Sequence, residues 1–173
     1  VNAYGATETP QIMCWYEVPP EFSSNGEQVP IGQGIDGVQV LVLNKAGQPV
    51  GIGELGEIHI RTPYLTQGYV NDEALTSARF LSNPFRPEAG DRMYRTGDMG
   101  RLLPDGNIEF AGRKDFQVKI RGFRIEVGEV EVALGQHPAV REIVVVPGEG
   151  SHSDRHLVAY LVTNENPSPS ISE

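Results

Sequence analysis

The amino-acid sequence predicts a β-rich α+β protein, and three observations support this fold class. Apolar and polar residues alternate over several short segments, as they do in half-buried strands. Twenty glycines and thirteen prolines are spread along the 173 residues, which suits many strands joined by tight turns. Only two stretches, near 72–80 and 126–136, have the spacing and end signals of a helix.

The first part of the chain is expected to consist mainly of strands. Residues 37–43 alternate and lead into a turn at 44–48, and residues 54–61 alternate again. Residues 99–103 and 107–111 flank Pro104-Asp105-Gly106, which is a strong hairpin signal. Between these strands, Asn71 or Asp72 is suited to cap a short helix that continues through Phe80.

The second part is expected to contain two strands, a helix and two further strands, with a boundary near 112–116. Over 126–136 the apolar side chains have helical spacing, and Glu126 and Glu129 lie in the first turn, where carboxylates suit the helix dipole. His137-Pro138 ends this helix. The apolar runs near 141–146 and 156–162 are typical of well-buried strands, and 164–173 reads as a linker or frayed end.

Composition excludes several classes of protein. The net charge of −9 argues against a general nucleic-acid binder. The longest aliphatic runs, such as 143–146, are far shorter than the roughly 20 residues that span a bilayer. Residues 1–5 resemble no secretory signal and include no initiator Met, so we expect the chain to begin within a longer polypeptide. Cys14 is the only cysteine, which excludes an internal disulfide and favours a reducing, cytoplasmic setting.

The opening segment, Asn2 to Thr9, brings together the residue types of a nucleotide site. Tyr4 can stack on a base, and Gly5 lets the backbone approach a ligand. Thr7 can donate to a phosphate oxygen, and Glu8 can hold Mg²⁺, which prefers carboxylate and phosphate oxygens. The same residues also suit a turn followed by a helix cap, so the segment alone leaves both interpretations open.

Two later segments have a similar ambiguity. In 94–98, Asp98 follows a glycine and can accept hydrogen bonds from two vicinal ribose hydroxyls, or it can form an Asx turn before the next strand. Residues 113–124 carry five cations and one carboxylate, on a hairpin with Gly122 at its turn: Arg113, Lys114, Lys119, Arg121 and Arg124 against Asp115. This cationic stripe suits either a phosphate-bearing ligand or a solvated hairpin face.

Taken together and in order, these segments resemble the adenylation domains of non-ribosomal peptide synthetases, within the superfamily of adenylate-forming enzymes. The resemblance covers residues 1 to about 163. Four motifs carry it, with Ala6 in place of the family's Pro and Gln67 in place of its Arg: Asn2-Ala3-Tyr4-Gly5-Ala6-Thr7-Glu8; Gly53-Glu54-Leu55-Gly56-Glu57-Ile58 with Gln67-Gly68-Tyr69; Tyr94-Arg95-Thr96-Gly97-Asp98; and residues 112–129. Four spaced motifs in the same order make the resemblance highly specific.

The resemblance implies a role for each matching residue. Tyr4 would stack on adenine, Thr7 would contact the α-phosphate, and Glu8 would bind Mg²⁺. Asp98 would hold the ribose hydroxyls, with Phe110 and Arg113 beside the same sugar. Asp115 matches the hinge between the large and small lobes, and the positions that line the amino-acid pocket are Ala3, Gln11 and Ile12.

The resemblance also implies an architecture and a reaction. Residues 1–112 would end the large lobe with a small β-barrel subdomain, 113–163 would form a truncated α+β small lobe, and 164–173 a tail or linker. The parent enzyme would activate an amino acid with ATP and Mg²⁺. It would then load the phosphopantetheine of a peptidyl carrier protein, with other synthetase domains in cis and neither nucleic acid nor membrane as partner.

The family's phosphate loop and the Asp that grips the substrate amine have no counterpart in these residues. No Lys follows Lys119, so the catalytic Lys is absent as well, and we expect no catalytic residue and no adenylation from these 173 residues alone. Two alternatives remain. One is a fatty-acid, aryl-acid or aminoadipate-type activating enzyme, although the sequence of residues 117–122 favours the synthetase type. The other is a non-catalytic module that docks on a carrier protein.

Overall fold

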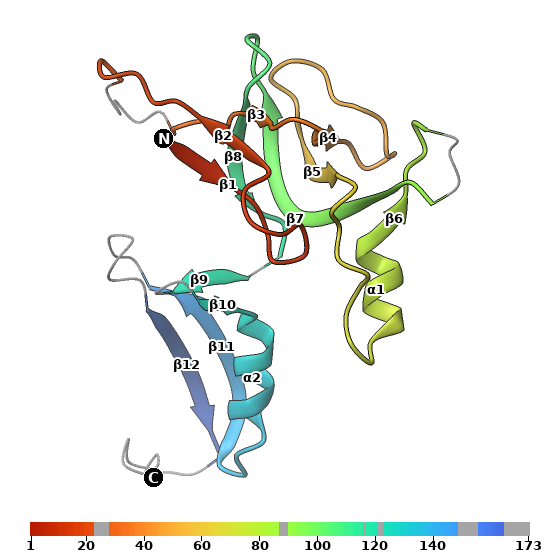
Figure 1. Ribbon diagram of the computed structural model, residues 1–173. Coiled ribbons are helices and arrows are strands. Elements are labelled where there is room, and N and C mark those ends of the chain that lie inside the picture. The colour runs from red at the N-terminus through yellow and green to blue at the C-terminus, as the bar shows by residue number, and fades with distance from the viewer. Residues whose placement is uncertain (23–27, 87–89, 116, 121–122, 149–155, 165–173) are drawn as a thin grey trace. The chain divides into compact units, whose positions relative to one another are not determined.

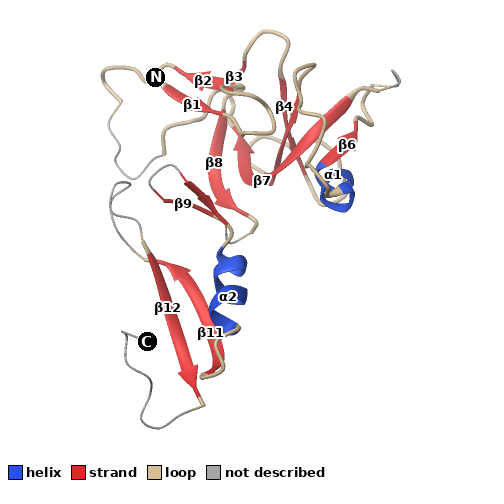
Figure 2. Cartoon of the chain, turned by 60° about the horizontal axis from the view of Figure 1, so that its bottom comes forward, coloured by secondary structure: helices blue, strands red, loops and turns tan. Residues whose placement is uncertain are grey.

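The computed structural model describes residues 1–22, 28–86, 90–115, 117–120, 123–148 and 156–164. These residues form two compact units, Val1–Lys114 and Asp115–Glu173. Strands dominate both units, and each contains a single described helix (Figures 1 and 2). The prediction of a β-rich chain is therefore confirmed.

The described residues of the first unit form two antiparallel sheets. A three-stranded sheet has the order β1-β2-β3, and a five-stranded sheet has the order β4-β5-β7-β6 with β8 also paired to β7. Their strands are β1 (Asn2–Tyr4), β2 (Cys14–Tyr16), β3 (Gln33–Gly34), β4 (Gln39–Leu43), β5 (Leu55–Arg61), β6 (Phe80–Ser82), β7 (Arg92–Leu102) and β8 (Ile108–Arg113).

The long strand β7 organises the larger sheet. It pairs with β5, β6 and β8, and it bends strongly along its length, so that the sheet curves into a half barrel (Figure 1). The three-stranded sheet is joined to this sheet through β8, because Ile31 N–H donates to the Ile108 carbonyl at 2.8 Å and Ile108 N–H donates to the Gly32 carbonyl at 3.0 Å. Residues 31–32 and 108, which are far apart in sequence, are thereby brought together beside Leu102 at the end of β7.

The core of the first unit draws on strands of both sheets. Its buried cluster consists of Cys14, Ile31, Val42, Val50, Ile58 and Ile108. Tyr4 and Phe110 pack against this cluster from β1 and β8. Two of the predicted site residues are thus fixed by ordinary apolar burial, the main favourable term in folding.

Helix α1 (Glu73–Arg79) begins as the sequence predicts, because the Asp72 side chain accepts a hydrogen bond from Leu75 N–H at 2.8 Å. The expected end at Phe80 is correct to within one residue, because Phe80 is the C-cap of the helix and its N–H donates to the Thr76 carbonyl. Phe80 also opens β6, where it pairs with Tyr94 and packs its ring 5.2 Å from the Tyr94 ring. Burial of this aromatic pair favours the change from helix to strand at Phe80.

In the second unit, the part of the chain that the structure describes forms two hairpins and a helix. They are β9 (Val118–Ile120), β10 (Phe123–Ile125), α2 (Val127–Gly135), β11 (Val140–Pro147) and β12 (Leu157–Thr163), with β9 paired to β10 and β11 to β12. These elements match the predicted order of strands and helix. The proposed turn at Gly122 lies outside the described residues, as do 165–173 of the predicted tail.

The prediction that the last two strands are well buried is wrong for much of their surface. Helix α2 packs on β11, and its Glu131 carboxylate accepts a hydrogen bond from Val145 N–H at 2.8 Å. Elsewhere on this hairpin, Val144 is 55% exposed and Tyr160 is 63% exposed. An apolar run shows that a strand has no polar face, but it does not show how many of its faces are covered.

Several elements escaped the sequence analysis. β1, β2, β3 and β6 are each two or three residues long. β7 begins at Arg92, well before the predicted start at 99, so Asp98 lies inside the strand rather than in an Asx turn before it. None of the helices among the described residues is long and apolar enough to cross a membrane.

Gly56 should tolerate no side chain, and Gly56→Ala should lower the free energy of unfolding by about 1–3 kcal/mol. A Cβ at Gly56 would lie 2.6 Å from the Leu43 carbonyl oxygen and 2.8 Å from Val50 Cγ1, in the β4–β5 pair. Urea denaturation of the two proteins measures the difference. Gly51→Ala is the matched control, because its Cβ meets its nearest atom, in Glu54, at 3.5 Å. Equal loss in both variants would contradict the packing argument.

Candidate functional site

The carboxylate of Asp98 is the centre of the candidate site. Asp98 lies in β7 and is 8% exposed. Its Oδ1 accepts a hydrogen bond from Arg113 Nη1 at 2.5 Å, and its Oδ2 accepts one from the Tyr4 hydroxyl. Tyr4 comes from β1 and Arg113 from the end of β8, so the structure brings three predicted site residues together from three strands.

Tyr4 is kept in its neutral, donating form. Burial raises the pKa of its hydroxyl well above the ordinary value, and the nearby charge of Asp98 raises it further. Because Tyr4 donates and Arg113 is a cation, the ionised form of Asp98 is the one that these two neighbours favour. The result is a largely buried carboxylate with fixed orientation.

The predicted turn interpretation of the opening segment describes its backbone correctly. Thr9 is fully buried, and its hydroxyl accepts from Ala6 N–H and donates to the Ala6 carbonyl, both at 3.1 Å. Gly5 allows the chain to fold back at this point, since a Cβ there would lie 1.8 Å from the Gln11 carbonyl oxygen. No helix follows the turn before β2, so the cap part of that alternative is wrong.

Glu8 is held by residues of the segment that follows β5. It is 6% exposed, and its Oε1 accepts a hydrogen bond from the Tyr69 hydroxyl at 2.6 Å. Thr66 N–H donates to the Glu8 carbonyl at 3.0 Å. Within the described ranges, no three His, Cys, Asp or Glu side chains gather closely enough to hold a metal by themselves.

The remaining predicted site residues of the first unit occupy its surface or its core. Ala3, Thr7 and Gln11 are exposed, Ile12 is 50% exposed, and Phe110 packs on the core cluster. Gln11 has a positive φ of 68°, in the loop that closes on Gly5. A shallow hollow of about 560 Å³ is lined by 67–73 and Thr76, and none of the predicted site residues lines it.

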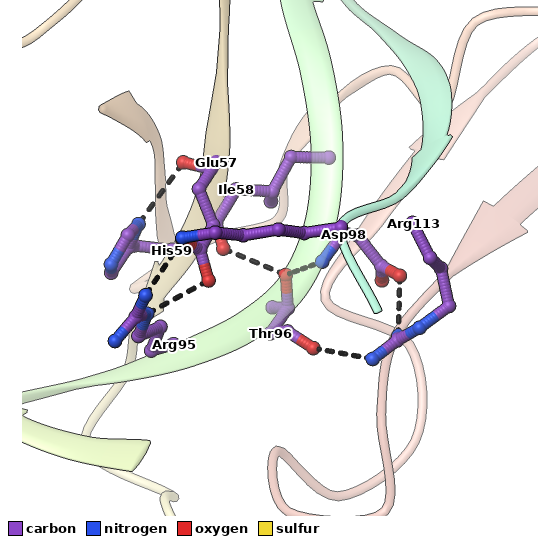
Figure 3. Close-up of polar contacts among 8 residues, drawn as sticks. Glu57, Ile58, His59, Arg95, Thr96, Asp98 and Arg113 are labelled. Atoms are coloured by element: carbon purple, nitrogen blue, oxygen red, sulfur yellow. Dashed lines mark hydrogen bonds and ion pairs between the residues drawn. The ribbon is translucent and has the colours of Figure 1, made fainter. Parts of the chain in front are cut away.

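A second buried carboxylate, Glu57 on β5, binds two cations. Arg95 donates to it through Nε at 2.9 Å and Nη2 at 3.2 Å, and Lys114 Nζ donates at 3.1 Å (Figure 3). His59 is buried next to them, with its Nδ1 3.0 Å from the Glu57 carbonyl oxygen.

The pKa values of this cluster are displaced in directions that favour ionised Glu57 and neutral His59. Burial alone would raise the pKa of Glu57, but the hydrogen bonds from Arg95 and Lys114 hold it below its ordinary value. Burial lowers the pKa of His59, and the hydrogen bond to the Glu57 carbonyl offsets only part of this effect. The cluster therefore has one buried anion, two partly exposed cations and an uncharged imidazole.

The cationic stripe does not behave as one surface. Arg113 and Lys114 belong to the first unit, where each makes an ion pair with a buried carboxylate, Asp98 and Glu57 respectively. Arg121 lies outside the described residues. Neither a free phosphate-binding stripe nor a fully solvated face describes the first two cations, because both are already bound within the protein.

Sequence analysis missed Thr96, Glu57 and His59 as contributors to the site, and it gave Tyr69 no role. Thr96 is 2% exposed and contacts both β5 and Asp98. Glu57 carried a recognisable signal, since a carboxylate inside an apolar strand is expensive to bury without cationic partners. The partners themselves are 38 and 57 residues away in sequence, so no local pattern points to them.

Comparison with known proteins gives consistent matches. The family model described as "AMP-binding enzyme" matches residues 1–70. A linear gramicidin synthase polypeptide from Brevibacillus parabrevis is 47% identical over 173 residues, which is 100% of this chain and 2% of that protein. Tyrocidine synthase 3 from the same organism is 48% identical over 94% of this chain and 2% of its own length. The chain thus spans about 2% of the length of these curated relatives.

A solved structure supports the same assignment. PA1221, described as an NRPS protein containing adenylation and PCP domains, superposes with a TM-score of 0.82 at 32% identity. The match covers 97% of this chain and 34% of that one. Residues 1–70 thus match the AMP-binding enzyme family model, and the whole chain is similar to a C-terminal part of the adenylation domains of non-ribosomal peptide synthetases, which confirms the resemblance drawn from the four motifs.

The stability of the protein should fall as the pH drops below about 6.5, and His59 should cause part of this fall. The folded-state pKa of His59 lies below its ordinary 6.5, so the unfolded chain takes up a proton that the folded protein does not. The stabilisation is present above pH 6.5 and is lost towards the folded pKa, by at most about 1.4 kcal/mol per pH unit. The lowered pKa of Glu57 acts in a separate window below its ordinary value of 4.5.

Urea unfolding at pH 7.0 and 5.5 tests this expectation with His59→Asn, which keeps a donor near the Nδ1 position. The variant should be less stable at both values but should lose less on acidification than the unaltered protein. An unchanged loss between the two pH values would show that other groups are responsible.

Proposed function

We propose that this chain supplies part of the nucleotide site of an enzyme that activates an amino acid with ATP. In that reaction the substrate carboxylate attacks the α-phosphorus, and pyrophosphate leaves as aminoacyl-AMP forms. The observation that carries the proposal is the Asp98 carboxylate, buried and oriented by Tyr4 and Arg113. A fixed, ionised carboxylate is suited to accept hydrogen bonds from two vicinal ribose hydroxyls.

The other predicted residues take places around this sugar. Phe110 and Arg113 lie beside the ribose, Tyr4 stacks on the adenine, and Thr7 contacts the α-phosphate. The proximity of Tyr4 and Arg113 to Asp98 supports the first part of this arrangement. The proposed residues of the amino-acid pocket are Ala3, Gln11 and Ile12. The chemistry of these side chains does not single out one amino acid as the substrate.

Glu8 is proposed as the ligand of Mg²⁺. The residues present fit this role only together with phosphate oxygens, because Mg²⁺ is commonly bound by one or two carboxylates plus substrate phosphates. The hydrogen bond from Tyr69 favours the ionised state of Glu8 and fixes its Oε1. When bound, the metal would offset the charge of the triphosphate.

We further propose the division of labour between lobes that the motifs imply. Residues 1–112 would form the end of the large lobe with its β-barrel subdomain, 113–163 part of the mobile small lobe, and 164–173 a tail or linker. The boundary of the two compact units at Lys114 and Asp115 supports a hinge at Asp115. The small lobe would help to load a carrier protein's phosphopantetheine, with other synthetase domains in cis. The adenylation and PCP domains named for PA1221 support these partners.

The proposed setting is a reducing cytoplasm, which the free and buried Cys14 suits. The 173 residues by themselves are proposed to be inactive, since no Lys follows Lys119 to stabilise the charge on the α-phosphoryl group. Amino-acid-dependent pyrophosphate exchange by the purified 173-residue chain would overturn this part of the proposal.

The central test is ATP–pyrophosphate exchange over a panel of amino acids, in a polypeptide that supplies the rest of the adenylation domain. Asp98→Asn should lower kcat/KM for ATP roughly ten- to a hundredfold, because it removes a charged acceptor worth about 1.5–3 kcal/mol. Asp105→Asn is the matched control in the β7–β8 turn, where Asn retains the oxygen that accepts from Asn107 N–H. Equal effects of the two substitutions would refute the assignment of Asp98.

The same assay separates the alternative functions. Exchange with fatty, aryl or aminoadipate-type acids, but with no α-amino acid of the common set, would favour the other activating enzymes. If no acid supported exchange in a folded domain, carrier-protein binding without ATP binding would favour the non-catalytic docking module.

A further inference from the structure

Thr96 is a buried residue whose hydroxyl and carbonyl contact the strands around Asp98. Its hydroxyl donates to the Ile58 carbonyl on β5 at 2.7 Å and accepts from the Asp98 N–H at 2.9 Å. Its carbonyl accepts from Arg113 Nη2 at 3.2 Å. Figure 3 shows Thr96 between Ile58 on one side and the Asp98–Arg113 pair on the other.

These contacts lie at a break in the regular pairing of β7. Between Glu57 and His59, β5 advances two residues while β7 advances four, from Met99 to Arg95. The pairing with β8 also shifts between Asp98 and Gly100, and Gly97 has a φ of +80°. Such a bulge leaves ladder groups without their usual partners and changes the direction of nearby side chains.

The Thr96 hydroxyl replaces hydrogen bonds that the bulge removes. It satisfies the Ile58 carbonyl and the Asp98 N–H, two groups that the shifted ladder does not pair with each other. Tyr4 and Arg113 bind the carboxylate oxygens, but the Thr96 hydroxyl is bound to the backbone from which that carboxylate projects. The position of the carboxylate therefore depends on both sets of contacts.

We propose that Thr96 is a positioning residue, whose hydroxyl sets the Asp98 backbone and whose carbonyl holds Arg113, so that the enzyme recognises the ribose hydroxyls of ATP. This inference rests on the proposed function of Asp98. It extends that function by assigning nucleotide sugar specificity to a residue that does not itself touch the nucleotide. A displacement of about 1 Å at such a group is enough to change rates by roughly a hundredfold.

The test compares Thr96→Val with Thr96→Ser in the polypeptide used for pyrophosphate exchange. Val keeps the shape but has no hydroxyl, whereas Ser keeps the hydroxyl and loses only a methyl group. The measured quantity is the ratio of kcat/KM for ATP to that for 2′-deoxy-ATP and 3′-deoxy-ATP. Thr96→Val should reduce this ratio roughly tenfold or more, and Thr96→Ser should retain it.

This ratio distinguishes positioning from stability, because a loss of folded protein lowers the rate with all three nucleotides equally. Amide hydrogen exchange of the nucleotide-free protein provides a second readout. The Asp98 amide should exchange at least several-fold faster in Thr96→Val than in Thr96→Ser. Should Thr96→Val not fold, Thr96→Cys replaces it, since a thiol is a much weaker donor.

The outcomes separate the inference from the function on which it rests. Unchanged sugar discrimination in Thr96→Val, with an active unaltered enzyme, would overturn the role of Thr96 alone. Equal loss of discrimination in the Ser and Val variants would also overturn it, because the methyl group would then be responsible. Absence of exchange in the unaltered enzyme would instead overturn the proposed function.

Discussion

The ion pair between Asp98 and Arg113 is the interaction on which the site depends. It connects the interior of β7 to the end of β8, and the Tyr4 hydroxyl adds β1 to the same carboxylate. A buried carboxylate is costly unless a cation and further hydrogen-bond donors compensate it. Here the compensating groups come from strands at the two ends of the sequence of the first unit, so the correct fold of that unit is a condition for the site.

The curved sheet brings these groups together by interrupting its own regularity. A fully regular β7 would place successive side chains on alternate faces along its whole length. The register shifts around Thr96 to Asp98 break this alternation at one place. The Thr96 hydroxyl satisfies the backbone groups left without ladder partners there, the Ile58 carbonyl and the Asp98 N–H. The polar site therefore lies where the strand pairing of this sheet is irregular, whereas its other described pairs are regular.

The sequence predicts features whose causes are local. The Asp72 cap and the Pro104–Gly106 turn follow from a few adjacent residues, and the structure has both. β1 to β3 and β6 were missed because strands of two or three residues exist through partners distant in sequence. The grouping of Tyr4 with Asp98, 94 residues apart, was accessible only through the family resemblance. Neither the local sequence patterns nor the family resemblance predicts the bulge at Thr96, because the register of strands depends on the whole sheet.

The second carboxylate, Glu57, connects the last residue of the first unit, Lys114, to the same part of the sheet. Lys114 is held twice: its Nζ binds Glu57 at 3.1 Å, and its N–H donates to the Gly97 carbonyl at 2.9 Å. Gly97 is itself the residue of positive φ within the bulge. The same irregularity that orients Asp98 thus also fixes the residue immediately before Asp115. Under the proposed function, the Asp98 carboxylate binds the nucleotide and Asp115 is the hinge. The positions of Asp98 and of the residue before the hinge both depend on the backbone of residues 96–98.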